Sequence, residues 1–303
     1  MRLKQYPTLE ILFIFLWNSG FIGAEYGLSR SGPFTLLFWR YGLLSVLLGL
    51  WLMKIGRMNW PGGKYVWRMG VVGGLAHGVW LSCALIALQL KVPAGIVALI
   101  TALQPLLTGA VSGIALRERA SARQWIGLVL GFIGVAVAVE ARLVHDGEAP
   151  TWAYILPFIS AASMTIASVL QRLWGRGTLL VSLDVSLFFQ SVFTVVALFV
   201  PAFWIEGLNT SWDFPYISTL IWLELGVSLG AYWTMWKLLS KKEAAVVSSL
   251  FYLSPPVTMF MAWLTFGDVL LVSDFLGLAI TGVGLIFVYG VEPRLSLSKV
   301  TQK

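Results

Sequence analysis

One stretch of this sequence occurs twice, and the repetition constrains the fold more than any other feature. Ala94–Val137 aligns without a gap on Ala244–Phe287 when the sequence is shifted by 150 positions. Each copy begins with an apolar run that contains a proline, Pro105 or Pro255, and continues through a charged turn into a second apolar run with matched glycines. Two such apolar copies predict a duplicated membrane domain.

The composition places the chain in a bilayer. Of its 303 residues, 58% are hydrophobic and 12% are charged, whereas soluble domains carry about 25% charged residues. The apolar segments are long and continuous, which is typical of membrane helices and excludes an outer-membrane barrel. Ten segments are long enough to span a membrane: Leu9–Leu28, Phe34–Met53, Met69–Gln89, Ala94–Leu116, Trp125–Glu140, Trp152–Trp174, Leu183–Phe203, Ser218–Leu239, Ala244–Phe266 and Val272–Val291. We therefore expect an all-α integral membrane protein with ten transmembrane helices.

The positive charges predict how these helices are oriented. With the amino terminus in the cytoplasm, most of the 21 Lys and Arg residues fall on cytoplasmic segments and the acidic links fall outside, as the positive-inside rule requires. The net charge of +7 thus reflects topology and does not indicate nucleic-acid binding. Five helices in each half turn the second half upside down, which makes an inverted repeat.

This topology defines the expected domains. We expect a first repeat over residues 1–142, a periplasmic loop over 143–151, a second repeat over 152–292 and a cytoplasmic tail over 293–303. Both termini would then lie in the cytoplasm.

Several short motifs lie within the predicted helices. They are Leu16-Trp17-Asn18-Ser19-Gly20-Phe21, Pro33–Arg40, Gln104-Pro105-Leu106, Arg117-Glu118, Leu253-Ser254-Pro255-Pro256 and Gly267-Asp268. With these motifs the chain resembles the EamA branch of the drug/metabolite transporter superfamily over essentially its whole length. The resemblance implies two five-helix repeats, and a function similar to that of exporters of amino acids and related metabolites in the bacterial inner membrane. The sixth helix departs from the pattern, because Ser160–Met164 stands where a tryptophan resembling Trp17 is common.

Polar groups near the two repeated prolines predict a central cavity. Proline leaves a backbone carbonyl free, which a bilayer tolerates only against protein or water. The residues that we expect to line the cavity from the fourth and ninth helices are Thr101, Gln104, Pro105, Tyr252, Ser254 and Pro255. The alternative is a pair of kinks whose polar groups are satisfied by neighbouring helices.

Aromatic and amide side chains add to this predicted site. Trp17, Asn18, Ser19, Trp80 and Tyr232 are suited to an amphipathic solute. Interfacial anchoring explains tryptophans near helix ends, but Trp17 and Trp80 lie deeper in their helices.

Four ionisable residues fall inside predicted helices, where charge is costly and usually faces a partner or a cavity. Glu25, Arg40 and Glu224 lie at similar depths, so Arg40 can pair with either carboxylate, as a structural ion pair or as a site for a zwitterionic solute. His77 is a candidate for proton coupling or solute binding, and its alternative role is a satisfied interhelical donor.

The remaining features indicate scaffold rather than chemistry. Gly127 and Gly131 belong to glycine ladders that let helices pack closely and that permit a homodimer. The helices over Trp125–Glu140 and Val272–Val291 carry few polar groups, so we expect them to pack against each other. Cys83 is the one cysteine, and no nucleotide-binding loop or catalytic motif is present, so we expect no cofactor, no metal and no enzyme activity.

Together these features predict a secondary active or facilitated transporter in the bacterial inner membrane. Its partners would be a small-molecule solute and the lipid bilayer, with protons as a coupling ion through Glu25, Glu224 or His77. We expect export of amino acids or related compounds by alternating access. The alternatives are another solute class, such as a drug, nucleoside, sugar or lipid-like molecule, and a non-transporting scaffold or receptor.

Overall fold

The chain folds into helices joined mostly by short loops. The computed structural model describes residues 8–58, 60–104, 106–108, 111, 122–145, 149–175, 182–239 and 250–289. In this part of the chain, β pairing is limited to one isolated bridge between Ser31 and Thr210. The helices are α1 (Thr8–Leu28), α2 (Pro33–Lys54), α3 (Gly63–Gly73), η1 (Gly74–Val79), α4 (Trp80–Gln89), α5 (Ala94–Thr101), α7 (Ala122–His145), η2 (Thr151–Ile155), α8 (Leu156–Gly175), α9 (Leu183–Trp204), α10 (Phe214–Ile221), η3 (Trp222–Ala231), α11 (Tyr232–Leu239), η4 (Leu250–Leu253), α13 (Ser254–Phe266) and α14 (Val272–Tyr289).

Six of these helical segments are long and apolar enough to cross a membrane. They are Thr8–Leu28, Pro33–Lys54, Gly63–Gln89, Thr151–Trp174, Leu183–Trp204 and Phe214–Met235, and shorter apolar helices include Trp125–Ala141 and Val272–Gly284. The prediction of an all-helical, multi-pass membrane protein is confirmed for the described residues.

The prolines act locally, at the ends of helices. α5 ends at Thr101, the residue whose carbonyl loses its helical partner because Pro105 has no N–H. The second proline, Pro255, lies in the first turn of α13, where a missing N–H costs no intrahelical hydrogen bond. In the described residues, α13 begins at Ser254 directly after the short η4 turn.

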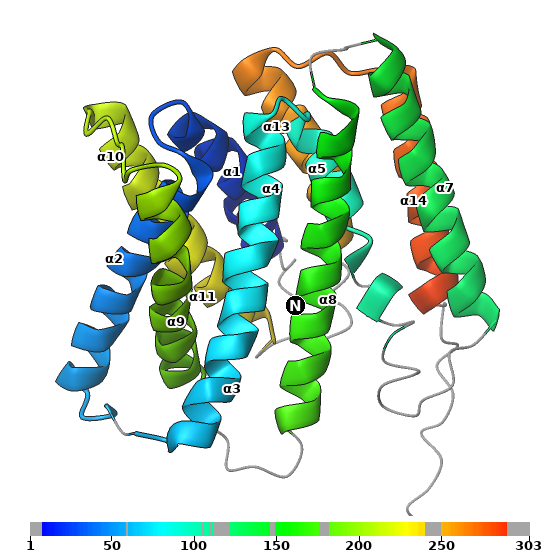
Figure 1. Cartoon of the computed structure of the whole chain (residues 1–303). Coiled ribbons are helices and arrows are strands. Elements are labelled where there is room, and N and C mark those ends of the chain that lie inside the picture. Colours follow the sequence, from blue (N-terminus) through cyan, green and yellow to red (C-terminus); the bar gives the residue numbers. More distant parts are fainter. Residues whose placement is uncertain are drawn as a thin grey trace, which may run out of the picture.

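Helices from the two halves of the chain interlock. α2 packs along α9, α1 packs against η3 and α13, and α8 packs against α4 and α5. Figure 1 shows these helices as one bundle, with α7 and α14 side by side at its edge. The prediction that these two helices pack against each other is confirmed.

Glycines make the contact between α7 and α14, and they do so reciprocally. A Cβ on Gly277 would lie 2.5 Å from the carbonyl oxygen of Gly134, and a Cβ on Gly284 would lie 2.6 Å from that of Gly127. Gly127 and Gly134 are the repeat counterparts of Gly277 and Gly284. Between them, Thr281 donates to the carbonyl of its own counterpart, Gly131, at 3.5 Å.

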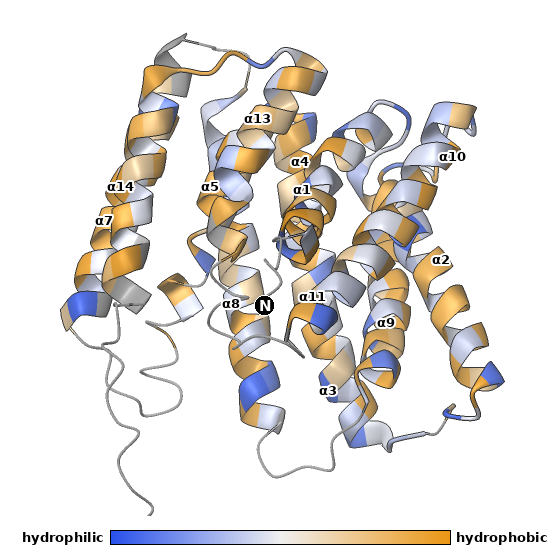
Figure 2. Ribbon diagram, turned by 180° about the vertical axis from the view of Figure 1, so that it is seen from behind, coloured by the Kyte–Doolittle hydropathy of each residue, from blue (hydrophilic) through white to orange (hydrophobic). Residues whose placement is uncertain are grey.

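Apolar side chains cover the outward surfaces of the bundle. α9 alone exposes Val196, Phe199, Val200 and Phe203, and Figure 2 shows hydrophobic residues along most of the helices. In water such a surface would drive aggregation, whereas lipid tails solvate it.

Candidate functional site

A cavity of about 60 Å³ lies between helices of both halves. This volume is well above the roughly 10–15 Å³ that a cavity needs to hold one water molecule. Its lining residues are Trp17, Gly20, Phe21, Ala24, Arg40, Tyr41, Leu44, His77, Trp80, Leu81, Ala84, Leu85, Leu187, Val227, Ser228 and Tyr232. The walls are thus mainly apolar and aromatic, with a few polar groups.

Two of the lining helices contain a π-helical segment at equivalent positions of the repeat. In the first half it is η1, which carries His77, and in the second half it is η3, which carries Glu224 and Ser228. Glycine permits the wider turn, because a Cβ on Gly230 would lie 2.9 Å from the carbonyl oxygen of Leu225, five residues before it. Such π-helical segments are rare in proteins as a whole, and those that occur often lie at functional sites.

Arg40 links α2 to η3. Its Nη2 donates to Ser228 Oγ at 3.1 Å, and its Nε lies 3.8 Å from Glu224 Oε1. Nε and both carboxylate oxygens of Glu224 have no hydrogen-bond partner among the described residues. Both residues are buried, with 8% of Arg40 and 0% of Glu224 exposed. The structure therefore places Glu224, and not Glu25, beside Arg40.

His77 makes the corresponding link from η1 to α9. Its Nε2 lies 3.1 Å from Gln190 Oε1, and Gln190 in turn donates to Ser186 Oγ at 2.9 Å. The ring of His77 also lies 5.1 Å from the ring of Tyr41. Gln190 stands 150 positions after Arg40, so the same position in each half contacts the π-helical segment of the other half.

Aromatic residues complete the enclosure. Trp17 packs edge-on against Tyr232 at 6.0 Å and against Phe251 at 4.9 Å between ring centroids. Trp80 lines the cavity from the first turn of α4. Of the predicted site residues, the structure thus brings together Trp17, Arg40, His77, Trp80 and Tyr232 at the cavity, with Glu224 next to Arg40.

Other predicted site residues form hydrogen bonds elsewhere in the bundle. Asn18 donates to Ile14 O and accepts from Thr258, and Ser19 accepts from the indole N–H of Trp222. Thr101 bonds to carbonyls of its own helix. Gln104 donates to Thr108 and Ser168. These polar groups are satisfied within their own helices or by neighbouring ones, and they do not line the cavity.

The rest of the predicted set lies apart. Ser254 and Pro255 are buried in the first turn of α13 and are not lining residues of the cavity. Pro105 and the side chain of Tyr252 lie outside the described residues. Glu25 faces the charges of Asp268 and Lys91 rather than that of Arg40.

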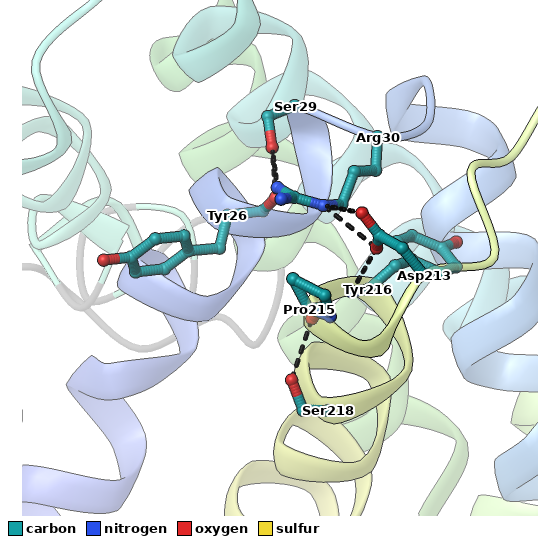
Figure 3. A network of polar contacts seen from close by, with 7 residues as sticks. All are labelled: Tyr26, Ser29, Arg30, Asp213, Pro215, Tyr216 and Ser218. Carbon is teal, nitrogen blue, oxygen red and sulfur yellow. Dashed lines mark hydrogen bonds and ion pairs between the residues drawn. The ribbon is translucent and has the colours of Figure 1, made fainter.

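A separate polar network joins the loops at one end of the bundle. Arg30 Nε donates to both oxygens of Asp213 at 2.9 and 3.0 Å, and Asp213 also accepts from the backbone N–H of Tyr216, which caps α10 (Figure 3). The Tyr216 N–H and then the Arg30 guanidinium hold the pKa of Asp213 below its usual value. Nearby, Glu206 accepts from the backbone N–H groups of Phe34 and Thr35 at 3.1 and 2.7 Å. The second half thereby caps the first turn of α2.

Comparison with known proteins finds similar transporters. Residues 8–139 match the EamA-like transporter family. An uncharacterised transporter of Archaeoglobus fulgidus is 21% identical, over 94% of this chain and 96% of its own length. The first part of the chain is thus similar to the EamA-like transporter family.

Two other similar proteins also have names that describe transport. The uncharacterised transporter YvbV of Bacillus subtilis is 27% identical, over 85% of this chain and 84% of its own length. A probable amino-acid metabolite efflux pump of Escherichia coli is 22% identical, over 95% of this chain and 96% of its own length. One protein of known crystal structure has 20% identity and a TM-score of 0.61, covering 95% of this chain and 98% of its own, which shows a common fold.

Three polar residues that lie at the cavity or next to it were missed in the sequence. Tyr41 follows Arg40, Ser228 lies four residues after Glu224, and Gln190 is a polar residue in the apolar run of α9. A search for polar residues 150 positions apart would have paired Gln190 with Arg40. Among the described residues, no group of three or more His, Cys, Asp or Glu side chains could hold a metal.

Proposed function

We propose that this EamA-like protein is a secondary transporter that exports a small amphipathic metabolite, an amino acid or a related compound, across the bacterial inner membrane. Ten helices would form two inverted repeats, over residues 1–142 and 152–292, with both termini in the cytoplasm. The two halves would rock about the central cavity and open it to each side in turn. The observation that carries the proposal is a cavity built from both halves, with aromatic walls and a buried arginine.

The reciprocal contacts support the inverted repeat. In a twofold arrangement every contact occurs twice: if two residues touch, their counterparts in the other half touch as well. A residue on the axis contacts its own counterpart. The glycine contacts between α7 and α14 have this form, and Thr281 meets Gly131. Arg40 and Gln190 repeat the relation near the cavity. The cation distribution along the chain supports cytoplasmic termini.

The lining supports the solute class. Aromatic rings offer apolar contact area, and Arg40 offers donors in a fork that matches a carboxylate. Two relatives named as probable amino-acid metabolite efflux pumps support the same class.

Counterflow in liposomes tests the proposal. Purified protein is reconstituted and loaded with one unlabelled solute at a time, from a panel of amino acids, sugars and nucleosides, and entry of the labelled solute is measured with and without a pH gradient. We expect counterflow of amino acids without any gradient. Folded protein that moves sugars or nucleosides but no amino acid would reject the amino-acid class, and no counterflow of any solute would reject transport.

The variant Glu224→Gln tests proton coupling in the same assay. Glu140→Gln is its matched control, because Glu140 is an exposed carboxylate on α7. If Glu224 carries the coupling, the response to the pH gradient disappears in Glu224→Gln and persists in the control. A response that persists in both variants would exclude Glu224 as the coupling group.

A further inference from the structure

We propose that Arg40 binds a carboxylate of the transported solute, and that this EamA site selects small carboxylates with an apolar body whether or not they carry an amino group. The inference rests on the proposed transport function and goes beyond it. It names the group that the site recognises, and it predicts that the amino group of an amino acid is dispensable.

The first argument is the position of Arg40. Among the described residues that line the cavity, it is the only Lys, Arg, Asp or Glu side chain. A guanidinium has five N–H donors in a planar fork. Ser228 accepts from Nη2, while Nε has no hydrogen-bond partner in the described part of the chain. The cavity is therefore in contact with a buried cation that has unused donor capacity.

The second argument is that Glu224 compensates Arg40 incompletely. A charge-assisted hydrogen bond between N–H and carboxylate is about 2.7–2.9 Å long, whereas Nε and Glu224 Oε1 are 3.8 Å apart. Glu224 is 0% exposed and does not line the cavity. A solute can reach Arg40 from the cavity, but it cannot reach Glu224 without movement of the helices. The accessible charge of the site is positive, so an anion fits it and an ammonium group does not.

The third argument concerns the rest of the solute. Beyond Arg40 the walls consist of Trp17, Tyr41, Trp80, Tyr232 and aliphatic side chains. The equivalent position in the second half is the neutral Gln190, which is bonded to His77. Among its described lining residues the cavity thus combines one cationic group, Arg40, with mainly apolar and aromatic side chains, which matches a carboxylate on an apolar body.

A ligand series on the wild-type protein tests the inference without any mutation. Binding of phenylalanine, 3-phenylpropanoate and phenethylamine is measured by isothermal titration calorimetry on the purified full chain in detergent. The series is repeated with alanine, propanoate and ethylamine, which cover a smaller body. We expect each acid to bind within about tenfold of its amino acid, and each amine to bind at least tenfold more weakly. An amine that binds as tightly as its amino acid would overturn the inference.

Variants locate the anion on Arg40. A hydrogen bond to a charged group contributes about 1.5–3 kcal/mol, so Arg40→Gln should weaken binding of the acids by about 10- to 150-fold. Lys54→Gln removes one exposed positive charge from the same helix and should leave the affinity unchanged. Arg40→Lys keeps the charge without the fork and should fall between wild type and Arg40→Gln. Equal affinity of wild type and Arg40→Gln would overturn the inference.

The counterflow assay distinguishes a failure of this inference from a failure of the proposed function. Counterflow of a solute without a carboxylate would overturn the role of Arg40 and leave transport standing. If Arg40→Gln does not fold, Ser228→Ala and the wild-type series decide, because Ser228 holds the guanidinium in place. Unchanged binding of the acids by folded Ser228→Ala, together with tight amine binding, would exclude the carboxylate site.

Discussion

The glycine contact between α7 and α14 allows a comparison of two nearly identical substitutions on one helix. Gly277→Ala places a methyl group 2.5 Å from the carbonyl oxygen of Gly134 and 2.9 Å from Cβ of Ala138. Gly282→Ala, five residues later, meets nothing within 4 Å. Both substitutions make the same chemical change within α14, so they differ mainly in what the new methyl group contacts.

The magnitude follows from two opposing terms. Replacing glycine by alanine within a helix stabilises it by about 0.5–1 kcal/mol. Adding a methyl group to a filled interface costs about 1–3 kcal/mol, and contacts of 2.5 and 2.9 Å are well inside the optimum of about 3.5–4.0 Å for carbon atoms. Gly282→Ala should therefore stabilise the protein slightly. The free energy of unfolding of Gly277→Ala should be about 1–3 kcal/mol lower than that of Gly282→Ala, because the gain in helix stability is common to both variants.

Thermal unfolding in detergent, followed by far-UV circular dichroism, measures the difference. One kcal/mol shifts the melting temperature of a large domain by roughly 2–4 °C, so Gly277→Ala should melt several degrees below Gly282→Ala. Gly284→Ala should behave like Gly277→Ala, because its Cβ would lie 2.6 Å from the carbonyl of Gly127. Equal melting temperatures for Gly277→Ala and Gly282→Ala would refute the close packing of these helices. If Gly277→Ala lowers the melting temperature and Gly284→Ala does not, the contact between α7 and α14 is not reciprocal.

Three further predictions concern polar contacts between the halves. Two donors, first a backbone N–H and then a guanidinium, hold the pKa of Asp213 low. The contribution of Asp213 to stability is therefore fully present above its unfolded-state pKa of about 4, and it is lost as the pH falls through the lower folded-state pKa. Asp213→Asn keeps the cap, and its melting temperature should depend less on pH than that of the wild type between about pH 5 and 3. Glu206→Ala removes a cap from α2 and should cost about 0.5–2 kcal/mol in the same unfolding assay, and an unchanged melting temperature would contradict the cap. His77→Ala and Gln190→Ala should be non-additive in a double-mutant cycle by about 0.5–1.5 kcal/mol, whereas additive losses would show that the two side chains do not interact.

The helical membrane fold could be predicted because its cause is spread over many residues. Long apolar runs must satisfy their backbone hydrogen bonds internally, and only helices do so within a single segment. The pairing of α7 with α14 could be predicted for a similar reason. Both helices carry few polar groups and several glycines, and glycines let two backbones approach closely.

The partners of individual side chains could not be predicted, because they depend on how each helix is rotated. Depth along the helices allowed Arg40 to meet Glu25 or Glu224, and only the packing of α1 and η3 decides between them. The π-helical segments remove the 3.6-residue regularity on which a prediction of facing residues depends. The spacing of Thr101 and Gln104 predicts that they share a face of the fourth helix, but α5 ends at Thr101 and neighbouring groups satisfy the polar atoms of both residues.

One pair of residues accounts for the single cation at the cavity. Arg40 and Gln190 lie 150 positions apart, and each contacts a π-helical segment that is distant in the sequence, η3 or η1. An arginine at position 190 would add a second buried cation, whereas Glu224 is the one carboxylate beside Arg40 among the described residues. Glutamine at position 190 keeps a contact with His77 and adds no charge. Under the role that we propose for Arg40, only one of the two positions attracts the carboxylate, so the solute would bind in one orientation.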